Sequence, residues 1–124
     1  MTILDTLKKW TDVELSFTNK EIALSKKNYR HIILYYFFGS CDICAQAMDL
    51  DDENFKSLYS DILTYIGFSI SEIHDVIEVW MLDKFSEDEL FAIKHGARCF
   101  REFENNPDGV GGLGVCFMKL SDNQ

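Results

Sequence analysis

The stretch SISEIHDVIEVWM, residues 69–81, carries the clearest indication of the fold class. Ser69 and Glu72 have the spacing of a capping box, in which each side chain accepts the other residue's backbone N–H at the start of a helix. Apolar residues then follow at the spacing that places them on one helical face. We therefore predict a helix here that buries Ile70, Ile73, Ile77, Trp80 and Met81.

Two neighbouring stretches repeat this pattern. Ser86 and Glu89 form a second capping-box pair before a helix whose apolar residues are Leu90, Ile93, Ala97, Phe100 and Phe103. On the other side, Asp51 or Asp52 starts a helix that Gly67 ends. Its apolar residues, again at helical spacing, are Phe55, Leu58, Tyr59, Ile62, Leu63 and Ile66.

The N-terminal third is less clearly divided. Ile3, Leu4, Leu7 and Trp10 predict a short first helix, and Asn19 can cap a second helix that runs to about Met48. Residues 31–38 are apolar on every side, which fits a central buried helix or a buried strand. We favour the helix, because good helix formers flank the segment and no second strand is evident.

The only glycine-rich segment lies near the C-terminus, at residues 109–114, and forms a connection before the short apolar stretch 113–120, a helix or a strand. No repeat or linker divides the chain of 124 residues. We therefore predict one all-α domain over residues 1–124, a compact bundle of five or six helices.

Charge and hydropathy exclude several classes of partner. The net charge is −9; residues 1–31 hold six Lys/Arg and four Asp/Glu, whereas residues 32–124 hold six and seventeen. Such an acidic body repels nucleic-acid phosphates and anionic membranes. The start of the chain has no signal-peptide pattern, and the longest apolar run, residues 32–38, is far too short for a membrane span. We expect a cytoplasmic protein with reduced thiols and no nucleic-acid or membrane partner.

Cys41 and Cys44 form the most suggestive local motif. They follow an apolar run and Gly39-Ser40, and so resemble the redox turn of thioredoxin-like proteins, where a strand delivers the cysteine pair to a helix N-terminus. The resemblance implies thiol-redox chemistry with an acidic first thiol. It covers about fifteen residues. The sequence departs from that family elsewhere: no proline separates the cysteines, and the later segments predict helices.

The same pair could instead help to bind zinc. Cys41 and Cys44, together with His95 and Cys99 on a later helix, make a ligand set adequate for tetrahedral zinc. The simpler interpretation is that all these thiols pack in the core, as free cysteines usually do. We therefore expect no cofactor, with zinc as the alternative.

Other motifs give weaker indications. The acidic run 49–54 lacks the turn glycine and final glutamate of a calcium loop, and residues 109–114 lack the lysine of a phosphate loop. The segment 66–73 is similar to the turn in some MerR-type regulators, but the would-be recognition helix carries only carboxylates among its charged residues. The possible bases His31, His74 and His95 have no evident nucleophile.

These observations favour a small acidic binding or interaction protein without catalytic activity, such as an inhibitor, an immunity-like protein or an adaptor. The alternatives are a thiol-redox or zinc protein that uses Cys41 and Cys44, and an acidic nucleic-acid mimic that occupies a basic protein. We also expect a homodimer, because exposed apolar patches mark interfaces. Its predicted interface residues are Tyr35, Tyr36, Phe37, Phe38, Leu113 and Phe117.

Overall fold

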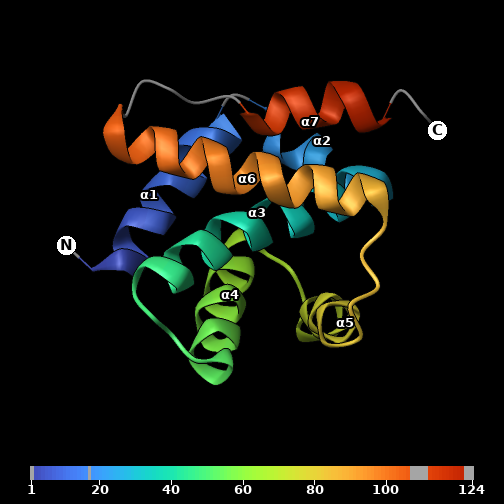
Figure 1. The fold of residues 1–124 in the computed structure, drawn as a ribbon. Helices are drawn as coiled ribbons and strands as arrows, with labels where there is room; N and C mark the ends of the chain where they lie inside the picture. Colours follow the sequence, from blue (N-terminus) through green and yellow to red (C-terminus); the bar gives the residue numbers. More distant parts are fainter. Residues whose placement is uncertain (1, 17, 107–111, 122–124) are drawn as a thin grey trace.

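The computed structural model describes residues 2–16, 18–106 and 112–121, and every regular element in these ranges is a helix (Figure 1). The prediction of an all-α fold is confirmed. The helices number seven in the described ranges rather than five or six. They are α1 (Ile3–Ser16), α2 (Lys20–Ser25), α3 (Lys27–Ala47), α4 (Asp52–Ile66), α5 (Ile70–Met81), α6 (Glu87–Asn105) and α7 (Gly112–Ser121).

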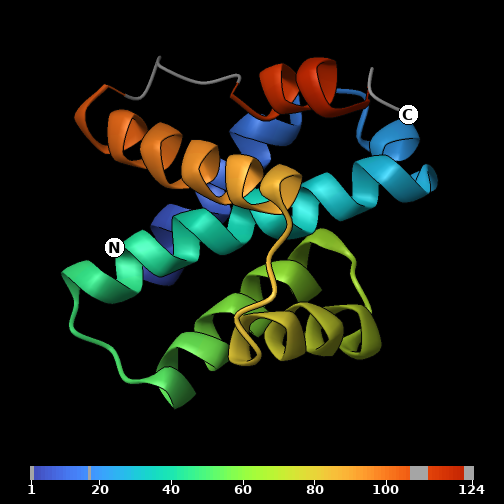
Figure 2. The same ribbon diagram turned by 45° about the vertical axis from the view of Figure 1, so that its right-hand side comes forward.

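Helix α3 is the centre of the molecule. In Figure 2, α6 runs along one side of α3, whereas α4 and α5 lie on the opposite side. Helices α1, α2 and α7 also contact it. Residues 32–41 are therefore all buried, which explains why this part of the sequence is apolar on every side. The choice of helix over strand for residues 31–38 is confirmed.

Two glycines allow α3 and α6 to pack backbone against backbone. A Cβ atom added to Gly39 would lie 1.9 Å from the carbonyl oxygen of Ile93, and one added to Gly96 would lie 1.8 Å from that of Tyr36. Any side chain at either position would thus hold the helices apart. This close crossing aligns the whole of α6 along the central helix.

The predicted helix starts are confirmed in detail. The side chains of Asn19 and Asp51 accept the capping hydrogen bonds of α2 and α4, and both capping boxes, at Ser69 and Ser86, are complete. Gly67 ends α4 with a φ of 124°, a conformation that L side chains rarely adopt. The local signals therefore position four of the helices correctly.

The predicted helix from Asn19 to Met48 is interrupted, and this raises the helix count. Lys26 is extended, with φ −100° and ψ 130°, so that α2 ends and α3 begins around it. The side chain of Arg30 donates a hydrogen bond to the carbonyl oxygen of Leu24 at 2.8 Å. This oxygen would accept the N–H of residue 28 in a continuous helix, so a side-chain contact replaces the helical bond.

The C-terminal prediction needs a second correction. Residues 109–111 of the predicted glycine-rich connection lie outside the described residues, but Gly112 and Gly114 belong to α7. The apolar stretch from Leu113 to Leu120 is thus a helix that starts within the glycine-rich segment. Leu113 and Cys116 of this helix are fully buried, so the helix packs on the core although it contains two glycines.

The exposed and buried faces of α5 and α6 also differ in part from the prediction. Ile70 and Met81 were expected to be buried, but they are 83% and 59% exposed, and the apolar residue Leu90 on α6 is 38% exposed. Helix α5 buries Ile73, as predicted, and also Val76, which the prediction did not include. Its buried stripe is narrow because α5 lies at the edge of the bundle, against α4 and the first half of α3.

Candidate functional site

A cleft of about 860 Å³ lies between the first turns of α3, the body of α5 and the start of α6. This volume lies in the range of ordinary ligand sites, roughly 300–1,000 Å³. The residues that line it are Ser25, Lys27, Asn28, Arg30, His31, Leu34, Tyr35, Glu72, Asp75, Val76, Val79 and Glu89.

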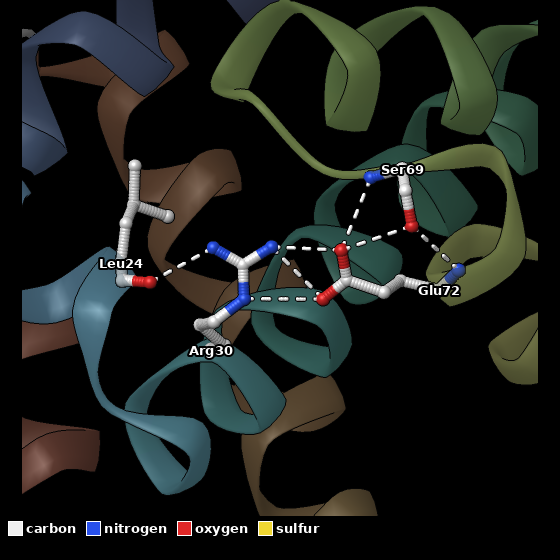
Figure 3. Close-up of polar contacts among 4 residues, drawn as sticks. All are labelled: Leu24, Arg30, Ser69 and Glu72. Carbon is white, nitrogen blue, oxygen red and sulfur yellow. Dashed lines mark hydrogen bonds and ion pairs between the residues drawn. The ribbon is translucent and has the colours of Figure 1, made fainter.

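One wall of the cleft is fixed by an ion pair between α3 and α5. Arg30 binds Glu72 through its Nε and Nη2 atoms, with N···O distances from 2.7 to 3.1 Å (Figure 3). Glu72 is also the capping-box residue of α5, and its Oε1 accepts the backbone N–H of Ser69. Its hydrogen bonds with Arg30 lower the pKa of the Glu72 carboxyl below its usual value.

Arg30 makes further contacts that leave it little freedom. Its Nη1 atom donates to the carbonyl oxygen of Leu24, and its guanidinium lies over the ring of Phe68, 4.5 Å from the centroid. Figure 3 shows how the guanidinium bridges α2 and the start of α5. The planar donor set of arginine suits such multiple contacts. Arg30 therefore has a structural role, because its contacts stabilise the cleft wall.

A second contact of the same kind joins α3 to α6. Oε2 of Glu89 lies 2.8 Å from Nε2 of His31, and Oε1 accepts the backbone N–H of Ser86 at 2.9 Å in the capping box. The Glu89 side chain is 14% exposed and the His31 side chain 55%. The capping glutamates of α5 and α6 thus bind two consecutive residues of the central helix.

Tyr35 lies one turn further along α3, between these two walls. It is 3% exposed and lines the cleft, and its ring packs edge-on against Phe85. Burial, followed by the nearby carboxylates of Glu89 and Asp75, raises the pKa of the Tyr35 hydroxyl far above its usual value. The hydroxyl therefore stays protonated and can act as a hydrogen-bond donor.

The cleft combines this polar rim with an apolar floor. Leu34 and Val76 are buried in the floor, and Val79 is half-buried. A smaller hollow of about 220 Å³ adjoins the cleft and shares Asn28, His31, Tyr35 and Glu89 with it. The depression therefore continues across the start of α3 towards α6.

The other two histidines lie away from the cleft. His74 is exposed on α5, and His95 stacks on Phe91 with its Nε2 atom 3.0 Å from Nη2 of Arg98. Burial and the charge of Arg98 lower the pKa of His95. Ser25 is the one serine among the residues that line the cleft, and no cysteine lines it.

The predicted redox and zinc residues do not form one group, and among them only the three cysteines are buried. Cys41 and Cys44 lie inside α3, far from its N-terminus, so the helix dipole does not stabilise a thiolate there. Burial raises the pKa of Cys41 well above its usual value and that of Cys44 to about 12. In the described part of the chain, no three His, Cys, Asp or Glu side chains form a group that could hold a metal, so His95 and Cys99 do not complete a set with them.

The predicted interface residues are core residues of the single chain. Tyr35, Tyr36, Phe37 and Phe38 are each 3% exposed or less, and Leu113 is fully buried. Phe117 is also buried, and its ring stacks on Tyr29 with centroids 4.6 Å apart. These side chains offer no surface to a second copy of the chain, so they give no support to a homodimer.

Sequence reasoning identified both capping glutamates but not their second contacts. Arg30 and Glu72 are 42 residues apart, and nothing in the sequence pairs them. The sequence predicts Tyr35 as an interface residue and does not place it in a cleft. The one available signal was that Arg30 and His31 interrupt the apolar surface of the central helix near its start.

Comparison with known proteins adds no further constraint on this site. No family model matches the chain, and no curated protein or solved structure matches it either.

Proposed function

We propose that this chain is a cytoplasmic binding protein that holds a segment of a partner protein in the cleft between α3, α5 and α6. The observation that carries the proposal is the combination of an apolar floor with a rim of fixed polar groups in one hollow of about 860 Å³. Such a combination is typical of binding sites, in which apolar contacts supply affinity and a few polar groups fix orientation.

The shape of the depression favours a chain segment over a compact ligand. The cleft and the adjoining hollow share four residues, so together they follow the start of α3 from Val79 on α5 to Leu120 on α7. An extended groove can accept several consecutive side chains of a peptide. The Arg30–Glu72 ion pair and the His31–Glu89 contact hold the walls before a partner arrives, which reduces the entropy lost on binding.

Photo-crosslinking in the native cell tests this proposal. A benzoylphenylalanine residue at position 79, in the cleft, should capture a defined partner protein. The same residue at position 65, an exposed tyrosine on α4, serves as the control because it replaces one aromatic residue with another outside the cleft. N28W places a large side chain in the depression and should abolish the crosslink from position 79.

Circular dichroism of each variant verifies that it is folded. A crosslink from position 79 that persists at full strength in N28W would contradict the proposal, as would capture of the same partner from position 65 alone.

A further inference from the structure

The charged groups around the cleft are predominantly carboxylates. Helix α5 contributes Glu72 and Asp75, and the start of α6 contributes Glu89 and, in the adjoining hollow, Asp88. Two cations, Lys27 and Arg30, face them from α3. The excess of carboxylates matches the net charge of −9 of the whole chain and favours a cationic ligand.

Arg30 offsets the charge of Glu72 but not that of the other carboxylates, because it is paired with Glu72. Its Nε and Nη2 atoms bind Glu72, and Nη1 binds the carbonyl oxygen of Leu24. An anionic ligand would have to break these contacts and approach the remaining carboxylates. Lys27 then stands against three carboxylates, Asp75, Glu89 and, in the adjoining hollow, Asp88, and this excess disfavours anions.

Asp75 and Glu89 retain capacity for a new ion pair. Asp75 is exposed and makes no side-chain hydrogen bond or ion pair with the described residues. Glu89 binds the Ser86 N–H and His31 and also interacts with the Tyr35 hydroxyl, but a carboxylate has about four acceptor positions. Tyr35, almost completely buried, lies near both carboxylates and adds a hydroxyl to the same corner of the cleft.

The floor next to this corner suits an aliphatic chain. Leu34 on α3 and Val76 and Val79 on α5 line the same cleft as the two carboxylates. Lysine and arginine side chains pack their methylene groups along apolar surface and leave the charged end on polar groups. An anionic rim above an apolar floor fits a side chain of this type better than a small hydrated cation.

We infer that the cleft recognises a lysine or arginine side chain presented by a segment of a partner protein. The charged end lies between Asp75 and Glu89, where the Tyr35 hydroxyl also faces it, and the aliphatic stem lies on Leu34, Val76 and Val79. This inference rests on the proposed binding function and specifies the chemistry of the partner.

Amide chemical-shift changes in ¹H–¹⁵N NMR spectra of the full chain test the inference. The probe is the peptide acetyl-Ala-Ala-Lys-Ala-Ala-amide, and the control peptide has norleucine in place of lysine, which keeps the stem and removes the charge. The lysine peptide should shift residues 27–35, 72–79 and 86–92 and bind with a Kd on the order of 1 mM. The norleucine peptide should bind at least fivefold more weakly.

Two conservative variants test the assigned carboxylates. D75N and E89Q should each weaken binding of the lysine peptide about threefold, a typical effect of losing one partly exposed charge partner. Glutamine also serves as the third residue of a capping box, so E89Q keeps the start of α6. D61N, which changes an exposed aspartate on α4, should leave the affinity unchanged.

Equal binding of the lysine and norleucine peptides would overturn the inference, as would an unchanged affinity in the D75N/E89Q double variant. Tighter binding of free 1,5-diaminopentane than of the lysine peptide would also overturn it, because the cation would then not need to belong to a protein. None of these results touches the crosslink from position 79, so failure of the inference and failure of the proposed binding function are separable.

Discussion

Replacing Gly96 with alanine should destabilise the protein, although the same change stabilises most helices. The added methyl group would lie 1.8 Å from the carbonyl oxygen of Tyr36, whereas real Cβ atoms essentially never approach within 3.0 Å. The obstacle is backbone, so no side chain can rotate away. Helices α3 and α6 would have to separate by roughly 1 Å, which loosens the close packing of the core between them.

The magnitude follows from two opposing effects. Overpacking of a well-packed core costs about 1–3 kcal/mol, and a clash with backbone belongs at the upper end of that range. The higher helix propensity of alanine offsets about 1 kcal/mol of this loss in stability. We therefore expect a net loss of about 2 kcal/mol in the free energy of unfolding.

Urea denaturation followed by circular dichroism at 222 nm measures this loss directly. Gly114→Ala is the matched control, because Gly114 also lies within a helix but has nothing within 4 Å of the added methyl group. It should stabilise the protein by about 0.5–1 kcal/mol. If Gly96→Ala behaved like Gly114→Ala, the close backbone contact between α3 and α6 would be refuted.

Two further predictions use the pKa shifts. Burial raises the pKa of Cys44 and Cys116 to about 12, so both thiols of the folded protein should react with a disulfide reagent at pH 8 at least ~100-fold more slowly than free cysteine. In urea, where the chain is unfolded, they should react at the rate of free cysteine. Comparable rates with and without urea would show that the thiols are accessible in the folded protein. The folded-state pKa of Glu72 lies below its unfolded value, so this group stabilises the protein above pH 4.5 and loses that contribution as the pH falls further. E72Q should therefore lose less stability than the unchanged chain between pH 4.5 and pH 2.5 in urea titrations, and parallel curves would contradict this role.

The helix starts could be predicted because their hydrogen bonds are local. The bonds between Ser69 and Glu72, and between Ser86 and Glu89, join residues three apart and depend on little else. The end of α4 at Gly67 is equally local, since it needs only a backbone conformation that glycine adopts easily. Such signals identify elements but contain no information on their neighbours.

The interruption at Lys26 could not be predicted in the same way. No proline or glycine marks it, and the residues around it are good helix formers. The break coincides with contacts of Arg30, whose side chain binds the carbonyl oxygen of Leu24 and, on α5, the carboxylate of Glu72. A tertiary contact thus overrides local helix propensity.

Which apolar side chains are buried depends on how the helices are arranged, and local sequence patterns do not contain this information. Ile70 and Met81 continue the helical pattern of α5, but α4 and α3 cover only the face that carries Ile73 and Val76. The aromatic run 35–38 shows the opposite case. Its four side chains point in different directions, and the chain supplies enough helices to bury all of them.

The cleft lies where two side chains each make both a local contact, which caps a helix, and a tertiary contact with the central helix. Glu72 and Glu89 each satisfy backbone donors at the start of a helix, and each also binds a residue near the start of α3. Because Arg30 and His31 are consecutive, the starts of α5 and α6 are held on either side of one turn of the central helix. The space between them cannot close without breaking a capping contact or an ion pair. The buried Tyr35 therefore lies between two fixed helix starts, and such fixed surroundings are the condition that a preorganised binding site requires.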